Sequence, residues 1–265
     1  MIGLLKNIWL YRHFILSSIK NEFLVRFSRS RLGALWMLVH PLTQVLIYAL
    51  VLSNVLAAKL PGVSNHYAYA IYLLAGMLGW NLFSEIVSRC LTIFTDQGNL
   101  IKKMLFPRIT LPAIAVGACL VNNALLAIAM VAVLFVLGHP PGLEMLWLVP
   151  LTLLVIALSV GAGLTLGILN VFVRDIGQVV PIFLQILFWF TPIVYPVNII
   201  PESLKGLVEY NPLYHIIGAY HQVILYNAPP QLDATALILL AFALGLLAFG
   251  LFIFRRAAPE IVDSL

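Results

Sequence analysis

Charged residues are scarce in this sequence. They make up 9% of its 265 residues, whereas apolar residues make up 62%. The surface of a water-soluble domain needs roughly a quarter of its residues to be charged. This composition therefore excludes a water-soluble enzyme and indicates a protein that lies mostly in a lipid bilayer.

Cysteines and clustered carboxylates are also few. The two cysteines, Cys90 and Cys119, show no CxxC or Cys/His spacing, which disfavours a disulfide framework or a metal site, so we expect both to be small packing residues. Glu85 and Asp175 stand alone in apolar surroundings, whereas a membrane enzyme such as a polyprenyl-phosphate transferase needs acidic clusters for metal and catalysis. The sequence has no GxxxxGK[ST] motif, so we expect no ATP hydrolysis by this chain.

Long runs of apolar residues make up most of the sequence. A helix needs about 20 apolar residues to cross the hydrocarbon of a membrane, and six stretches meet that length with at most one charge each. The sequence therefore predicts an all-α membrane protein forming one domain over residues 1–265. Its six expected spans are 34–58, 67–88, 109–138, 145–173, 176–197 and 234–254.

The basic residues fall on one side of these runs. Of the fifteen lysines and arginines, only Lys59 and Lys205 fall on the other side. Positive charge marks the cytoplasmic face of membrane proteins, so we expect a multi-pass protein of the bacterial inner membrane with both termini in the cytoplasm. The net charge of +5 lies beside apolar spans, which favours anionic lipid headgroups over nucleic acid as its partner.

Two segments outside the spans have distinctive patterns. In residues 1–33, Leu4, Ile8, Ile15, Ile19 and Phe23 recur at helical spacing between polar residues, which predicts an amphipathic helix in the cytoplasmic interface. A solvated tail is the alternative. Residues 198–233 are too polar for a lipid-facing helix. Pro192 and Pro196 just before this segment and Pro201 just after its start interrupt helical structure there. We expect short re-entrant or interfacial helices there, on the external side.

One ion pair is expected inside a span. Glu85 and Arg89 are four residues apart, so both lie on the same face of a helix. A carboxylate inside a membrane span is by default a candidate for function. Because Arg89 neutralises Glu85, we favour a structural lock near the cytoplasmic end of the second span.

Three local sequences carry a family resemblance. They are VRFSRSRLGALW at residues 25–36 with Pro41, NLIKKMLFPR at 99–108 with Leu111 and Pro112, and FVRDI at 172–176 leading into TPIVYP at 191–196 and NPL at 211–213. In this order, and on six spans, they resemble the transmembrane subunit of ABC-2 type exporters of O-antigen, capsule or teichoic acid polysaccharides. The resemblance covers nearly the whole chain.

The resemblance implies a function and partners. The chain is expected to form a homodimer with a channel between its protomers and to export a polysaccharide linked to undecaprenyl pyrophosphate, with O-antigen favoured. Two copies of a separate ATPase subunit would bind ATP and Mg, so no cofactor is expected in this chain. The rival within the same family plan is an exporter of a small hydrophobic drug or lipid.

The cytoplasmic side holds two sets of candidate site residues. Residues 96–108 suit a coupling helix toward the ATPase, since their apolar positions have helical spacing and Pro107 ends the segment. The candidate coupling residues are Asn99, Leu100, Ile101, Lys102, Lys103, Met104, Leu105, Arg174 and Asp175. Arg26, Arg29 and Arg31 either anchor the first span or, as the resemblance implies, form an entrance for the lipid pyrophosphate, which guanidinium groups bind well.

Aromatic side chains are the candidates for the substrate path. A path that passes sugar without gripping it should offer rings rather than deep polar pockets. Rings also gather at membrane interfaces in all such proteins, and Tyr67, Tyr69, Tyr210 and Tyr214 are predicted to be such a belt. The candidates for the path are Trp36, Tyr48, Tyr72, Trp80, Phe83, Trp189, Phe190 and Tyr195.

Overall fold

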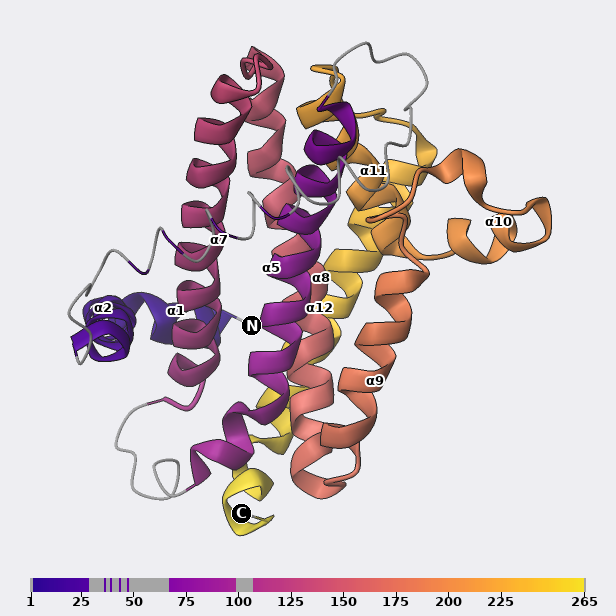
Figure 1. Ribbon diagram of the computed structural model, residues 1–265. Helices are drawn as coiled ribbons and strands as arrows, with labels where there is room; N and C mark the ends of the chain where they lie inside the picture. Colours follow the sequence, from indigo (N-terminus) through magenta and orange to yellow (C-terminus); the bar gives the residue numbers. More distant parts are fainter. Residues whose placement is uncertain are drawn as a thin grey trace.

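The computed structural model describes residues 2–28, 67–98 and 107–264, together with four single positions at 36, 39, 43 and 47. Every regular element in these ranges is a helix (Figure 1). This follows from the composition, because an apolar chain in lipid must satisfy its backbone N–H and C=O groups internally, as a helix does. The helices are α1 (Ile2–Leu10), α2 (Arg12–Ser28), α5 (Ala68–Asp96), α7 (Thr110–Val136), α8 (Leu148–Phe172), α9 (Ile176–Trp189), α10 (Glu202–Glu209), α11 (Pro212–Leu225) and α12 (Ala234–Ser264), with short 3-10 turns η3 (Leu143–Trp147) and η4 (Val197–Ile199).

Four helical segments are long and apolar enough to cross a membrane. They are Ala68–Asp96, Thr110–Val136, Leu143–Phe172 and Ala234–Ala257. They agree with the second, third, fourth and sixth expected spans, although the first of them continues eight residues beyond its predicted end at residue 88. The expected span over 34–58 lies outside the described residues.

The expected fifth span, 176–197, is only partly helical. Its helix, α9, ends at Trp189 after 14 residues, which corresponds to about 21 Å of rise at 1.5 Å per residue. A hydrocarbon core is about 30 Å thick. Pro192 and Pro196 follow at once, and proline cannot donate the hydrogen bond that a helix interior requires. Six spans therefore stay a prediction.

The long helices pack side by side in one bundle, in which α5, α8 and α12 run in the same direction and α7 runs in the opposite one (Figure 1). α5 lies between α7 and α8, α12 packs on the far side of α8, and α11 packs against α5. The main core is formed by α5, α8 and α11, and a second apolar cluster around Phe94 and Phe254 closes the end of the bundle where α5 and α12 finish. The bundle thus has two distinct ends, one with Asp96 and the C-terminus and the other with α10 and α11.

Small residues allow α5 and α8 to approach closely. A Cβ atom added at Gly167 would lie 2.2 Å from the backbone oxygen of Cys90, and one added at Gly163 would lie 2.7 Å from the Cys90 Cβ. These glycines form a GxxxG pattern, which permits close helix contact in membranes. Both cysteines are fully buried, which confirms that they are packing residues.

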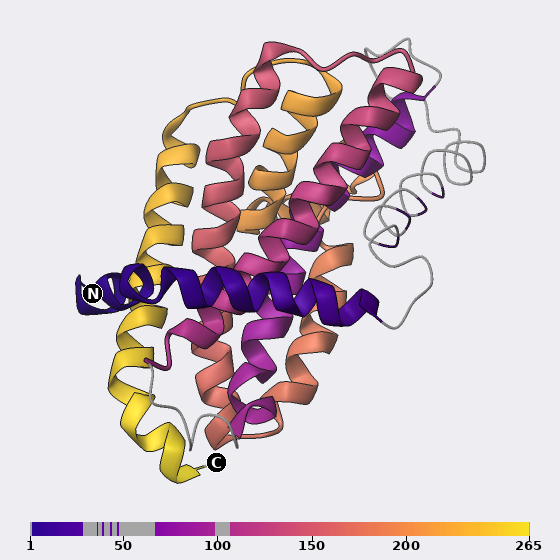
Figure 2. The same cartoon turned by 90° about the vertical axis from the view of Figure 1, so that its left-hand side faces the viewer.

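The N-terminal arm lies across the bundle. Figure 2 shows α1 and α2 running roughly perpendicular to the long helices, and α2 contacts α7. Ile15 and Phe23 are buried, while Trp9, Leu10 and Leu16 are exposed. The apolar face predicted from Ile15, Ile19 and Phe23 is therefore the face that packs on the bundle, whereas the outer face carries both apolar side chains and the exposed Lys6, Arg12 and Lys20. A helix of this kind suits a lipid interface.

Candidate functional site

Two groups of polar contacts connect elements that are distant in sequence. One joins the N-terminal arm to the bundle on the side of α7, and the other joins α5 to the chain after α9 at the end that carries α11. Both are candidates for function, because polar side chains and non-helical backbone within a membrane domain are costly unless other parts of the protein bond to them.

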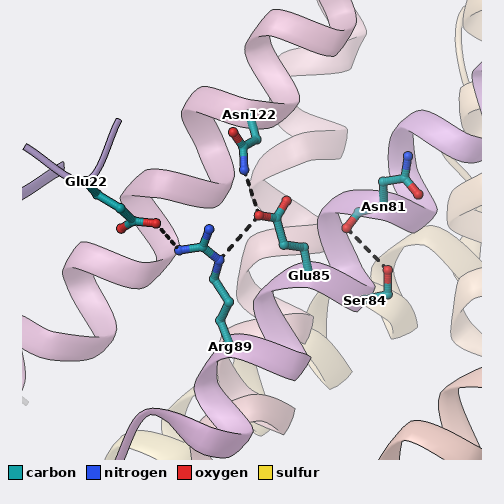
Figure 3. A network of polar contacts seen from close by, with 6 residues as sticks. All are labelled: Glu22, Asn81, Ser84, Glu85, Arg89 and Asn122. Carbon is teal, nitrogen blue, oxygen red and sulfur yellow. Dashed lines mark hydrogen bonds and ion pairs between the residues drawn. The ribbon is translucent and has the colours of Figure 1, made fainter. Parts of the chain in front are cut away.

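The first group centres on Arg89 of α5 (Figure 3). Its Nη1 donates to Glu22 Oε1 of the arm at 2.6 Å, and its Nε lies 3.3 Å from Glu85 Oε1 one turn earlier. Asn122 Nδ2 of α7 donates to the same Glu85 oxygen at 2.7 Å. The predicted pair of Glu85 and Arg89 is therefore confirmed, and it is part of a four-residue network that ties α2, α5 and α7 together.

Sequence reasoning missed Glu22 and Asn122 as members of this network. A signal for each was present. Glu22 is the only carboxylate in an otherwise basic arm, and Asn122 and Asn123 are adjacent amides in a span without charge. Amides inside such spans commonly bond to a neighbouring helix, and Asn123 Nδ2 does so by donating to the backbone oxygen of Leu78 at 2.9 Å.

The second group holds the chain that follows α9. The Tyr72 hydroxyl lies 2.8 Å from the backbone oxygen of Pro192 and 2.9 Å from that of Tyr195, and the Tyr69 hydroxyl donates to the backbone oxygen of Val194. These carbonyls belong to a non-helical stretch that cannot satisfy them itself. The two tyrosines of α5 therefore fix the TPIVYP segment in place.

The prediction that Tyr69 belongs to an interfacial belt is wrong. Its side chain is only 4% exposed, because its hydroxyl is used inside the protein to hold the loop after α9. Tyr67 and Tyr210 are exposed, and Tyr214 is half-buried.

The same loop is tied to the start of α11. Asn211 Nδ2 donates to Thr191 Oγ1 at 2.8 Å, while Asn211 Oδ1 accepts from the Leu213 N–H at 3.0 Å and so caps α11. Pro212 follows at the first position of the helix, where its missing N–H costs nothing. The TPIVYP and NPL motifs, twenty residues apart in sequence, thus form one connected unit.

An open cavity lies beside this unit, with a volume of about 830 Å³. It is bounded by η3 and the start of α8, by α11, by the loop after α9 and by the start of α12. Tyr72 and His221 form part of its wall, with their rings stacked at 3.7 Å between centroids. Sequence reasoning gave no sign of it, because its walls come from segments more than 160 residues apart.

The aromatic candidates for the path separate into buried and exposed sets. Trp80 and Phe83 are buried in the bundle core, and Trp80 packs edge-on against Phe188 at 5.4 Å between centroids. Trp189 and Phe190 are 59% and 43% exposed at the end of α9. Tyr195 is half-buried in the loop, Trp36 is a half-buried single position, and Tyr48 lies outside the described residues. Among the described rings of this set, Trp189 and Phe190 are the most exposed.

The cytoplasmic candidates are described only in part. Arg174 and Asp175 form the tight turn between α8 and α9, at the same end of the bundle as Asp96 (Figure 1). Arg26 lies in α2, but its side chain is not among those described. The remaining candidates lie outside the described residues: Arg29, Arg31, Asn99, Leu100, Ile101, Lys102, Lys103, Met104 and Leu105.

Comparison with known proteins identifies relatives along the whole chain. The O-antigen export system permease protein RfbA of Klebsiella pneumoniae is 27% identical over 246 residues, which cover 92% of each chain. The protein of the same name from Myxococcus xanthus is 26% identical over 268 residues, covering all of both chains. The polysialic acid transport protein KpsM of Escherichia coli is 28% identical over 245 residues, covering 92% of this chain and 93% of its own.

A family profile covers most of the same region. The profile described as ABC-2 type transporter matches residues 13–225, which include nearly all of α2, the polar network and the unit formed by the TPIVYP and NPL motifs. Together with four helices able to cross a membrane, this match shows that the chain belongs to the ABC-2 type transporter family.

Proposed function

We propose that this chain is the channel-forming permease subunit of an ABC transporter that exports a polysaccharide linked to undecaprenyl pyrophosphate, with O-antigen as the favoured cargo. One observation carries the proposal: proteins named for O-antigen export and for polysialic acid transport align with this chain over nearly its full length. The length of these alignments matters, because an alignment over the whole chain includes the arm and the segment between α9 and α12.

Energy for export would come from a separate ATPase subunit that binds ATP and Mg. The proposed contact with it is the segment 96–108 together with Arg174 and Asp175. Support comes from the topology, since α5 ends at Asp96, α7 begins at Thr110 and the α8–α9 turn lies at the same end of the bundle (Figure 1). Arg255 and Arg256 of α12 also lie toward this end, which favours a cytoplasmic location under the positive-inside rule.

The proposed assembly is a homodimer with two ATPase copies and a channel between the protomers. α9 supports this assembly because it has few contacts in its own bundle and presents a row of exposed apolar side chains: Val179, Ile182, Phe183, Ile186 and Trp189. A second protomer or lipid would cover such a row. Arg26, Arg29 and Arg31 are proposed as an entrance for the pyrophosphate, or as anchors of the first span.

A deletion strain tests the proposed cargo. The gene would be removed from its host, and surface polysaccharide and inner-membrane glycolipid would be measured with and without the restored gene. We expect surface polysaccharide to disappear while its lipid-linked form accumulates in the inner leaflet. Unchanged surface polysaccharide, with a changed phospholipid or drug profile instead, would contradict the proposal and favour export of a small hydrophobic compound.

A further inference from the structure

The cavity beside α11 has the chemistry of a ligand site that the family assignment does not describe. Its volume of about 830 Å³ falls within the roughly 300–1,000 Å³ typical of ligand pockets. It lies at the end of the bundle away from Asp96 and the C-terminus, on the side proposed to be external. Its walls belong to one protomer, so it differs from a channel formed between two.

Rings, hydrogen-bonding groups and aliphatic side chains together line its wall. Trp147, Tyr214 and Tyr226 supply aromatic faces, and Gln222 and Gln231 supply amides. Sugars present flat C–H faces and rows of hydroxyls, so they bind where aromatic faces and amide or carboxylate groups occur together. An acyl chain would need no polar groups on the wall.

The charge of the wall narrows the class of ligand. Glu209 and Asp233 contribute two carboxylates, whereas no lysine or arginine is found among the described residues that line the cavity. The hydrogen bond from the Ala236 N–H lowers the pKa of the Asp233 carboxyl, so this group is ionised at neutral pH. Negative charge repels pyrophosphate and acidic sugars, and it leaves neutral sugars as the matching cargo.

His221 contributes to the wall as a buried, uncharged ring. Burial lowers the pKa of His221 to about 3, so its ring is neutral, and its Nε2 has no hydrogen-bond partner in the part of the chain that the structure describes. The ring is instead held flat against Tyr72. Gly76 of α5 provides the space for it, because a Cβ there would lie 3.0 Å from Nε2. A stacked, uncharged ring pair of this kind provides an aromatic surface rather than a polar contact.

We infer that this cavity is a subsite for a neutral saccharide segment of the exported polysaccharide, formed by η3, α11 and the start of α12. The inference rests on the proposed function, since it names the part of the cargo that one protomer holds on the external side. Weak binding at this subsite would hold the part of the polysaccharide that has already reached the external side between transport steps. It would still allow the polysaccharide to be released.

Fluorescence of Trp147 tests the inference. The complex of the full chain with its ATPase subunit would be placed in lipid nanodiscs and titrated with short neutral oligosaccharides, released by mild acid from the surface polysaccharide of the host. We expect a saturable change in tryptophan emission that Trp147→Phe removes. Tyr226→Ala should weaken binding by about 2- to 10-fold, the effect of losing one aromatic contact. Tyr210→Ala is the matched control, because Tyr210 is 90% exposed and does not line the cavity.

Two competing ligands and one complementation assay decide the remaining outcomes. Oligosialic acid should not compete, and equal competition would overturn the assignment to neutral sugars. Quenching of Trp147 by lipids with brominated chains, unaffected by the oligosaccharide, would identify an acyl-chain site and overturn the inference. If the restored gene returns polysaccharide to the surface but no oligosaccharide binds, the inference alone fails. If the restored gene does not return it, the proposed function fails.

Discussion

At the scale of single residues, Arg89 is a cation shared by two carboxylates on different helices. It lies between Glu22 and Glu85, and the side chains of all three are only about a quarter to a third exposed. Removal of the arginine would leave two carboxylates without their shared cation, whereas removal of Glu22 would leave Arg89 paired with Glu85. The two changes should therefore differ in cost, because an unpaired charge away from water is more expensive than a lost contact.

Arg89→Leu should lower the free energy of unfolding by about 2–3 kcal/mol, and Glu22→Gln by about 1 kcal/mol. Unfolding of the purified protein in detergent, followed by tryptophan fluorescence, measures both. Glu202→Gln is the control, since Glu202 pairs with Lys205 on the exposed α10 and such surface pairs contribute roughly 0–1 kcal/mol. Equal costs for Arg89→Leu and Glu202→Gln would show that the network does not hold the arm on the bundle.

At the scale of elements, the closeness of α5 and α8 depends on the absence of side chains at two positions of α8. The atom nearest to Gly167 is a backbone oxygen, that of Cys90, which cannot move aside as the end of a flexible side chain could. Larger residues there would push the two helices apart. Because α5 also carries Tyr69, Tyr72 and Arg89, its displacement would disturb both groups of polar contacts.

Gly167→Ala should therefore destabilise the protein by about 1–3 kcal/mol, the usual cost of overpacking. The midpoint of thermal unfolding in detergent provides the measurement. Gly245→Ala in α12 is a matched control, because a Cβ at Gly245 would meet no atom within 4 Å. A loss of stability at Gly245 as large as that at Gly167 would contradict this explanation, because Gly245→Ala creates no close contact and alanine has the higher helix propensity.

The segment between α5 and α7 is the second element with a testable role. Leu100→Asp together with Leu105→Asp should detach or uncouple the ATPase subunit while the membrane domain still folds, because an apolar contact with the ATPase cannot accept two carboxylates. Co-purification of the two subunits and export in cells are the measurements. Leu207→Asp serves as the control, since Leu207 is exposed on α10 at the other end of the bundle. An intact, active complex carrying both aspartates would place the coupling contact elsewhere.

At the scale of the whole molecule, the two ends of the bundle are proposed to have different functions. The end with Asp96, the Arg174–Asp175 turn and the C-terminus is proposed to face the ATPase, and the other holds α10, α11 and the cavity (Figure 1). α9 begins at the first end and reaches the loop held by Tyr69 and Tyr72 toward the second. Motion of α9 would therefore move the loop and the start of α11 together, since Asn211 binds Thr191.

The exposed rings at the end of α9 provide a test of the proposed path. Trp189→Ala and Phe190→Ala should each lower export by about 2- to 10-fold, as expected from the loss of one aromatic contact with sugar. Neither should alter the level of the chain in the membrane, since both side chains are largely exposed. Surface polysaccharide, divided by the amount of permease in the membrane, is the quantity to compare, with Tyr210→Ala as the control. Equal export from all three variants would remove these rings from the path.

Much of the architecture could be predicted from the sequence, because the relevant physics is local. Length and apolarity determine which segments suit a bilayer, and four described helices match expected spans. Spacing along one helix placed Glu85 next to Arg89, and the periodicity of Ile15, Ile19 and Phe23 identified the packed face of the arm. The end of α9 was predicted less well, because the expected span ran to residue 197 whereas the helix ends at Trp189.

The tertiary structure decided what depends on contact between distant segments. Glu22 meets Arg89 across 67 positions. Tyr69 is buried rather than interfacial because the carbonyl of Val194, 125 residues away, accepts a hydrogen bond from its hydroxyl. The cavity needs α5, α8, α11 and α12 at once, so no single segment carries its signal. Local patterns record the preference of each segment for lipid, water or a helix, whereas partners and cavities arise only when packing brings several segments to one place.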